Sequence, residues 1–229
     1  MLWKNDRELF EAAAKEIFVA LVGDILDQMG YTKQFLGPEI KPLDHSMVTI
    51  GRAMPVLEAD VYGKGSGQSQ NPIFQKPYGL LFEALDSLRE NEVYICAGSS
   101  YDYALWGGLM STRAIKLGAA GAVLDGYSRD TNEILELRFP TFSAGTYAQD
   151  QGPRGKVIDY GVEIEFNGIS VRPGDVVFGD RDGVLIIPKD AEQEAFSKAF
   201  EKARGEKLVR KALEAGMSTV EAFRKFGIM

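Results

Sequence analysis

The chain has 229 residues, of which 45% are hydrophobic and 26% charged, a composition typical of a globular protein with one sizeable core. Its formal net charge of −7 argues against a nucleic-acid binder held by phosphate contacts. The single cysteine excludes an intramolecular disulfide, and the single histidine argues against a zinc site built on paired imidazoles.

The sequence carries no signal for export or membrane insertion. Its start, MLWKNDRELFEAAAKEIF, is charged and helical rather than apolar like the core of a signal peptide. No run of 18 apolar residues predicts a spanning helix. We therefore expect a cytoplasmic protein with neither a membrane nor a nucleic acid as its partner.

The first third of the chain combines a helix, short strands and a long loop. The apolar spacing predicts an amphipathic helix from Asp6 to Met29, ended by Gly30. Residues 47–63 contain short β-type runs. Residues 63–79 mix Gly, Ser, Gln, Asn and Pro, which indicates a loop long enough to be a lid over a binding site. A surface insertion without function is the alternative.

Two βα units follow. Residues 91–98 predict a strand, and LMSTRAIKL predicts a helix that ends at Gly118. Residues 119–126 predict a second strand, followed by a loop with Arg129 and Asp130 and then the helix TNEILELRF. This alternation indicates parallel strands joined by a right-handed crossover, and therefore an α/β fold.

The remainder is β-rich and then helical. Between Gly152 and Pro188 the pattern predicts a hairpin turning at Asn167-Gly168 and two strands around Asp182-Gly183. A helix is expected from Ala191 to Ala215, and a second one begins at Ser218, where Ser218 and Glu221 form a capping box. We therefore predict a main domain over residues 1–189 and a helical extension over residues 190–229, a candidate oligomerisation element.

Two loops are expected to meet at one edge of the sheet. The helix after Gly107-Gly108 advances roughly 15 Å over about ten residues. The next strand returns roughly 16 Å over about five residues. The Gly-rich loop and the Arg129-Asp130 loop should therefore lie together beyond the carboxyl ends of neighbouring parallel strands, where open α/β sheets bind ligands.

The residues at this edge suit a small 2-oxo acid chelated to a metal. The free N–H groups of Gly108, Leu109 and Met110, behind Gly107, can hold a carboxylate. Arg129 offers a planar fork for a carboxylate or a developing oxyanion. Asp130 is a hard oxygen donor suited to Mg²⁺ or Mn²⁺.

An alternative needs no ligand. Asp130 followed by Glu133 also fits a helix N-cap with a capping box, and paired glycines before a helix are often only a turn. Asp125, before Gly126, is interpreted as a turn former, with indirect contact to the site as the second reading.

The segment WGGLMSTRAIKLGAAGAVLDGYSRD resembles the signature of the RraA-like proteins, which include the 4-hydroxy-4-methyl-2-oxoglutarate aldolases. The shared pattern is a residue in the Gly-rich loop, here Gly108, then twenty positions, then Arg129-Asp130. FPTFSAG, VRPGDVVFGDRDGVLIIP and GDILDQMG also match, so the resemblance spans most of the chain.

The resemblance implies a swivelling β/β/α fold, a metal-dependent lyase activity, and homotrimers or homohexamers. It assigns the metal to Asp130, the pyruvyl group to Arg129, and the substrate carboxylate to the backbone amides from Gly107 to Met110. Sites in this family lie between subunits, where an acid from a neighbouring chain's C-terminal region contributes. Glu206 is the candidate for that acid.

This sequence departs from the aldolase pattern at one position. Characterised aldolases carry an acid where this chain has Gly108, and that acid is thought to act in proton transfer. The regulator branch, which inhibits ribonuclease E, has Gly there and continues R-D-x-x-E-D. Here Glu133 matches that continuation, whereas Ile134 replaces the final acid.

We therefore expect chemistry through a pyruvate enolate. Oxaloacetate decarboxylation needs no base at C4, whereas aldol cleavage requires a proton acceptor that Gly108 cannot supply, such as a lid residue or Glu206. A non-catalytic binding regulator is the alternative function. A methyltransferase is disfavoured, because no Gly-rich cofactor loop follows an early strand.

Overall fold

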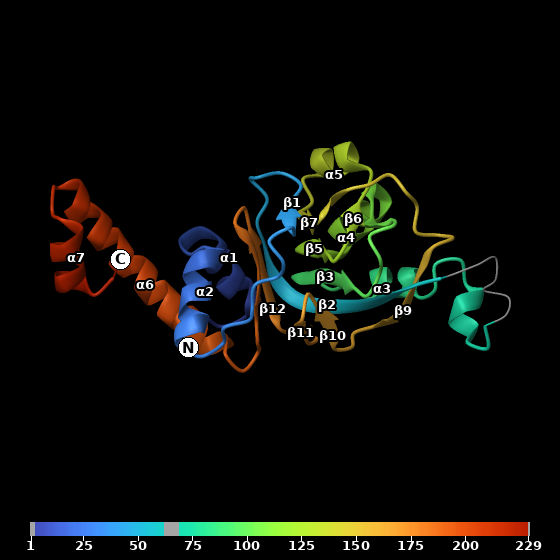
Figure 1. The fold of residues 1–229 in the computed structure, drawn as a ribbon, viewed down its shortest axis with the longest axis horizontal. Helices are drawn as coiled ribbons and strands as arrows, with labels where there is room; N and C mark the ends of the chain where they lie inside the picture. The colour runs from blue at the N-terminus through green and yellow to red at the C-terminus, as the bar shows by residue number, and fades with distance from the viewer. Residues whose placement is uncertain (1–2, 62–68, 229) are drawn as a thin grey trace.

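The structure is a mixed β-sheet with helices packed around it (Figure 1). It is a computed structural model that describes residues 3–61 and 69–228. The helices are α1 (Asp6–Glu16), α2 (Val19–Gln28), the 3₁₀ turn η2 (Pro72–Gln75), α3 (Leu81–Asp86), α4 (Gly108–Leu117), α5 (Thr131–Leu137), α6 (Glu192–Glu214) and α7 (Thr219–Phe226). The strands are β1 (Lys41–Pro42), β2 (Thr49–Asp60), β3 (Glu92–Ala97), β4 (Ala104–Trp106), β5 (Gly121–Leu124), β6 (Tyr127–Ser128), β7 (Thr141–Ser143), β8 (Gly145–Thr146), β9 (Gly155–Tyr160), β10 (Ile164–Phe166), β11 (Ile169–Val171), β12 (Val176–Asp180) and β13 (Gly183–Ile187).

The main sheet runs in the order β1-β7-β5-β3-β2-β12-β13, with β9 also paired to β2. The strands β7, β5, β3 and β2 are parallel, as the alternating βα pattern predicts, and the flanking pairs are antiparallel. The segment before β1 also bonds to β13, since the N–H of Leu36 donates to the carbonyl of Val184. The sheet is therefore nearly closed, which confirms the expected α/β fold with a β-rich second half.

The N-terminal helical region is broken in two. Ile17 and Phe18 are extended, so the prediction of one helix from Asp6 to Met29 is wrong. The N–H of Val19 donates to the Asp180 carboxylate at 2.9 Å, so a side chain from β12 satisfies a group at the start of α2.

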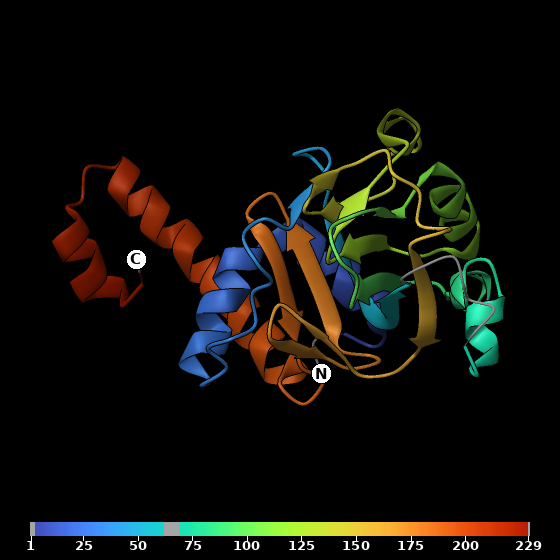
Figure 2. The same cartoon turned by 45° about the vertical axis from the view of Figure 1, so that its right-hand side comes forward.

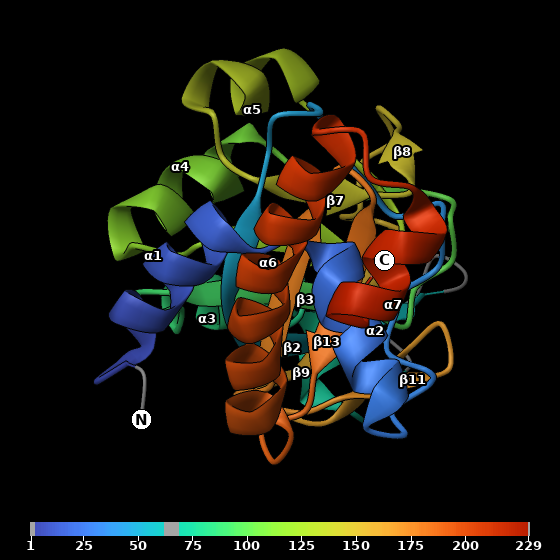
Figure 3. The same cartoon turned by 90° about the vertical axis from the view of Figure 1, so that its left-hand side faces the viewer.

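One face of the sheet is covered by α1, α2 and the first half of α6 (Figure 3). The buried side chains of α6 that join this core are Ala195, Phe196, Ala199, Phe200 and Ala203. The outer half of α6 and α7 extend away from the sheet (Figures 1 and 2). A division of the chain at residues 189 and 190 stays a prediction.

The expected local signals of the second half are present. Asn167 and Gly168 have φ angles of 50° and 77° between β10 and β11, and β12 pairs with β13. Ser218 and Glu221 form the capping box of α7. The sequence predicts short β runs over residues 47–63, of which 62 and 63 lie outside the described residues. The structure instead has one strand over Thr49–Asp60, because β2 pairs with β3, β12 and β9. The proposed lid falls partly on residues 62–68, outside the described residues.

Candidate active site at the β4 and β6 edge

The two predicted loops meet beyond the ends of neighbouring parallel strands. β3 and β5 pair in parallel, with Val93 opposite Gly121. Beyond them a small sheet, which the sequence reading missed, joins β4, β6 and β8. The N–H of Arg129 donates to the carbonyl of Trp106 at 2.9 Å. The Gly-rich loop and the Arg129-Asp130 loop are thus joined by backbone hydrogen bonding.

Glycine at position 107 allows the two loops to approach closely. A Cβ atom added to Gly107 would lie 2.6 Å from Oδ2 of Asp130, closer than real Cβ contacts occur. The N–H of Gly108, the first residue of α4, donates to the same oxygen at 3.2 Å. The Asp130 carboxylate therefore lies at the N-terminus of α4, where free N–H groups and the helix dipole stabilise negative charge.

Asp130 does not cap its own helix. It occupies the N-cap position of α5 with a φ of 56°, a left-handed conformation that is uncommon outside glycine. Its side chain makes no cap hydrogen bond to α5. The capping-box alternative for Asp130 and Glu133 is therefore wrong, and the carboxylate is directed to the Gly-rich loop instead. Strained non-glycine residues of this kind cluster at functional sites.

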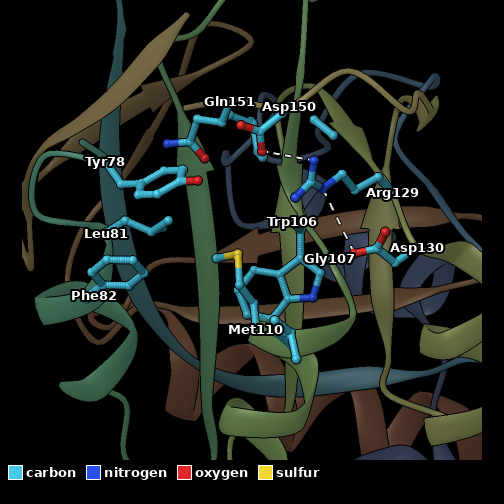
Figure 4. A pocket seen from close by; sticks show the side chains of 13 residues that line it. Tyr78, Leu81, Phe82, Trp106, Gly107, Met110, Arg129, Asp130, Asp150 and Gln151 are labelled. Atoms are coloured by element: carbon cyan, nitrogen blue, oxygen red, sulfur yellow. Dashed lines mark ion pairs between the residues drawn. The ribbon is translucent and has the colours of Figure 1, made fainter. Parts of the chain in front are cut away.

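Arg129 is held by a carboxylate that the sequence reading did not single out. Its Nη1 lies 2.9 Å from Oδ1 of Asp150, and its Nε lies 3.9 Å from Oδ2 of Asp130 (Figure 4). The side chains of Arg129 and Asp150 are each 37% exposed, so a small molecule can still reach the guanidinium. Asp150 follows β8 in the polar stretch AQDQG, where no local pattern distinguishes it from an ordinary loop acid.

Glu133 covers the position at which the aldolase pattern has an acid. A Cβ atom added to Gly108 would collide with the Glu133 carboxylate. A carboxylate from the first turn of α5 thus occupies the space that a side chain at position 108 would fill.

Arg129, Asp130, Asp150 and the Gly-rich loop line one cavity of about 260 Å³, and Glu133 lies outside its lining (Figure 4). One wall is formed by α3 and the loop that precedes it. The others are formed by β4 with the start of α4, by the loop after β6, and by the loop before β9. The lining residues are Tyr78, Leu81, Phe82, Ala104, Leu105, Trp106, Gly107, Leu109, Met110, Arg129, Asp130, Asp150 and Gln151. Of the residues predicted from the sequence, Gly107, Leu109, Met110, Arg129 and Asp130 line the cavity. Gly108 does not line it, but its N–H donates to Asp130.

Two of the site residues predicted from the sequence, Asp125 and Glu206, lie outside the cavity. Asp125 accepts a hydrogen bond from the Tyr101 hydroxyl at 2.7 Å, and burial raises the pKa of its carboxyl. Glu206 lies on α6, on the far side of the sheet from α3 and α4 within one chain (Figure 1). Neither residue lines the cavity.

The donor set at Asp130 suits a hard cation held with few protein ligands. Among residues 3–61 and 69–228, no three His, Cys, Asp or Glu side chains form a metal-binding group. Asp130 is 45% exposed, and its Oδ2 accepts one backbone hydrogen bond. Mg²⁺ typically binds through one or two carboxylates and keeps several waters or substrate oxygens, which fits a single exposed carboxylate at a cavity wall.

The described residues also contain no helix that is long and apolar enough to cross a membrane.

Curated relatives resemble the chain over most of its length. A protein of Methanocaldococcus jannaschii is 34% identical over 190 residues, which cover 82% of this chain and 89% of that protein. The "Putative 4-hydroxy-4-methyl-2-oxoglutarate aldolase" of Halalkalibacterium halodurans is 29% identical and covers 88% of this chain and 87% of its own. Protein DlpA of Legionella pneumophila is 28% identical over 90% of this chain, which spans about a third (32%) of that protein.

Solved structures share the fold. A protein of Pseudomonas syringae superposes with a TM-score of 0.82 at 21% identity and covers 99% of this chain and 97% of that one. RraAS2 of Streptomyces coelicolor, described as an unusual member of the RNase ES inhibitor RraA protein family, gives 0.76 at 22% identity and covers 91% and 98%. The family model described as Aldolase/RraA matches residues 19–186, and this chain therefore belongs to the RraA-like family.

Proposed function

We propose that the protein is a divalent-metal-dependent lyase that cleaves a carbon–carbon bond of a 2-oxo acid through a pyruvate enolate. The main support is the convergence of Arg129, Asp130 and the N-terminus of α4 on one cavity. Relatives named as 4-hydroxy-4-methyl-2-oxoglutarate aldolases agree with this chemistry. Asp130 would hold the metal, which when bound supplies positive charge to the keto and carboxylate oxygens of the substrate.

The residues of the chain divide the remaining work. The N–H groups of Leu109 and Met110, in the first turn of α4, receive the substrate carboxylate. The guanidinium of Arg129 stabilises the negative charge that develops on the enolate oxygen when the bond breaks. Asp150 holds that guanidinium in place through the 2.9 Å ion pair, so the positive charge is positioned before the reaction begins.

Glu133 is our candidate for the proton acceptor in aldol cleavage. The Glu133 carboxylate takes the proton of the C4 hydroxyl, and the C3–C4 bond breaks. The electron pair of that bond forms the enolate, and C4 leaves as part of a carbonyl product. The proton held by Glu133 is then returned to C3 of the enolate, which gives pyruvate and regenerates the carboxylate. Its support is the Glu133 carboxylate standing where a side chain at Gly108 would stand. Oxaloacetate needs no such acceptor, because loss of CO₂ from C3 yields the same enolate.

The test is a pyruvate assay coupled to lactate dehydrogenase. Oxaloacetate and several 4-hydroxy-2-oxo acids are supplied with Mg²⁺ or Mn²⁺, and parallel reactions contain EDTA. We expect chelator-sensitive pyruvate above the metal-only background from at least one of them. If no substrate gives chelator-sensitive pyruvate above that background, the lyase function is refuted.

A non-catalytic binding regulator is the second candidate, and Gly108 favours it, because the regulator branch also has glycine at this position. It predicts that the protein releases no pyruvate above the metal-only background from any of these acids.

We also propose a homotrimer or homohexamer in which Glu206 of one subunit approaches the cavity of the next. Light scattering should give a mass in solution of three or six chains.

A second experiment tests whether the site is shared between subunits. In that case Glu206→Gln should lower turnover, whereas Glu201→Gln, on the same helix, should not.

A further inference from the structure

We propose that the cavity selects a 2-oxo acid whose C4 carries an apolar group of about the size of one ring, in preference to a second carboxylate. This inference rests on the proposed function, because it takes the pyruvyl end of the substrate to lie at Arg129 and Asp130. It concerns the opposite side of the same cavity, where the described side chains are uncharged and mostly apolar.

The cavity has a charged side and an apolar side. Figure 4 shows Arg129, Asp130 and Asp150 on one side and Tyr78, Leu81 and Phe82 on the other. The rings of Tyr78 and Phe82 lie 5.5 Å apart with a tilt of 60°, so the two aromatic side chains form one surface. The volume of about 260 Å³ is near the lower limit of small-molecule pockets, roughly 300 Å³, which fits a short acid with one ring.

The apolar side offers no cation to a second carboxylate. Among the described residues that line the cavity, Arg129 alone is positively charged, and it already contacts two aspartates. The lysines near Tyr78 are engaged elsewhere. The ammonium of Lys76 pairs with Glu83, and that of Lys156 donates to the carbonyl oxygens of Lys76 and Pro77. An anionic C4 substituent would lose its hydration without gaining a cationic partner, because the polar groups of Tyr78 and Gln151 are uncharged, and this costs free energy.

Gln151 lies between the two sides. Its side-chain amide donates one N–H to the buried Glu58 carboxyl at 2.7 Å, and this bond fixes its orientation. The amide oxygen can accept from a hydroxyl on the substrate, and the uncharged side chain offers no cation to a carboxylate.

The test measures binding of two 2-oxo acids that lack the C4 hydroxyl and cannot undergo aldol cleavage. Isothermal titration calorimetry with the full chain and Mn²⁺ compares 2-oxo-4-phenylbutanoate with 2-oxoglutarate. We expect the phenyl compound to bind at least about tenfold more tightly, from roughly 25 cal/mol per Å² of buried apolar surface. Equal or tighter binding of 2-oxoglutarate overturns the inference.

Phe82 allows a matched test, because it is 59% exposed and its truncation leaves the core intact. Phe82→Ala should weaken binding of the phenyl compound by roughly fivefold and change that of 2-oxoglutarate by less than about twofold. Phe223→Ala, at a phenylalanine that is 57% exposed on α7, should change neither. Retention of full phenyl affinity in Phe82→Ala also overturns the inference.

Turnover separates the two proposals. Phenyl-selective binding without pyruvate formation from any substrate supports the selectivity and refutes the lyase. Pyruvate formation with a preference for the C4 carboxylate supports the lyase and refutes the selectivity.

Discussion

Exchanging the acid between positions 133 and 108 tests how this chain compensates for its glycine. In the structure the Glu133 carboxylate covers Gly108, so a side chain at position 108 and the Glu133 side chain compete for one space. Gly108→Asp alone forces two carboxylates together, whereas Gly108→Asp combined with Glu133→Ala places a single acid there. We expect the double variant to recover aldol cleavage that Glu133→Ala loses.

The magnitude follows from the role of a general base. Removal of a positioned base typically costs about 10²–10⁴-fold in rate, so Glu133→Ala should lower kcat for a 4-hydroxy-2-oxo acid by at least about 100-fold. Its oxaloacetate decarboxylation should change by less than about threefold, because that reaction has no hydroxyl proton to remove. Gly108→Asp alone displaces the end of the Glu133 side chain. This should lower the free energy of unfolding by on the order of 1 kcal/mol or less, because Glu133 is exposed.

The assay is the coupled measurement of pyruvate with both substrates, with thermal melts to verify folding. Glu136→Ala, at an exposed glutamate of the same helix, is the control and should behave like the parent protein. Equal losses in cleavage and decarboxylation would refute the base role and indicate a general effect on the site. An unchanged cleavage rate in Glu133→Ala would refute it outright.

Two further predictions concern stability. Burial raises the pKa of the Glu58 carboxyl well above its usual 4.5, and its Oε2 has no hydrogen-bond partner among the described residues. Because the folded state holds this proton more tightly, stability falls as the pH rises from about 4.5 through the folded-state pKa. Glu58→Gln should therefore gain on the order of 1 kcal/mol over the parent between pH 5 and pH 8 in urea melts; an identical pH profile would contradict this. Arg52, whose side chain is 19% exposed, pairs with Asp6 and with Glu192, which is 13% exposed. Arg52→Ala should cost about 2–4 kcal/mol by leaving these acids unpaired, and a loss below about 0.5 kcal/mol would argue that the ion pairs contribute little.

Local signals in the sequence predict the parts of the fold that local physics decides. Asn167 and Gly168 supply the positive φ angles of the hairpin, and Ser218 with Glu221 caps α7 without outside help. The break between α1 and α2 could not be predicted in this way, because Asp180, from the other end of the chain, caps α2.

The same distinction holds for the candidate site. The meeting of Arg129 and Asp130 with the Gly-rich loop follows from strand and helix lengths, which the sequence displays. Asp150 and the aromatic wall at Tyr78 and Phe82 arrive from loops and a short helix, whose positions depend on tertiary contacts. Glu133 could be recognised as a neighbour of Asp130, but its position over Gly108 required coordinates.

The central claim is that Arg129 and Asp130 act together on the enolate, and oxaloacetate decarboxylation tests it most directly because it needs no base at C4. With saturating Mn²⁺, Arg129→Ala and Asp130→Ala should each lower kcat by about 10²–10³-fold, whereas the exposed-site controls Arg181→Ala and Asp159→Ala retain it. Decarboxylation at the parent rate in either site variant would contradict the account.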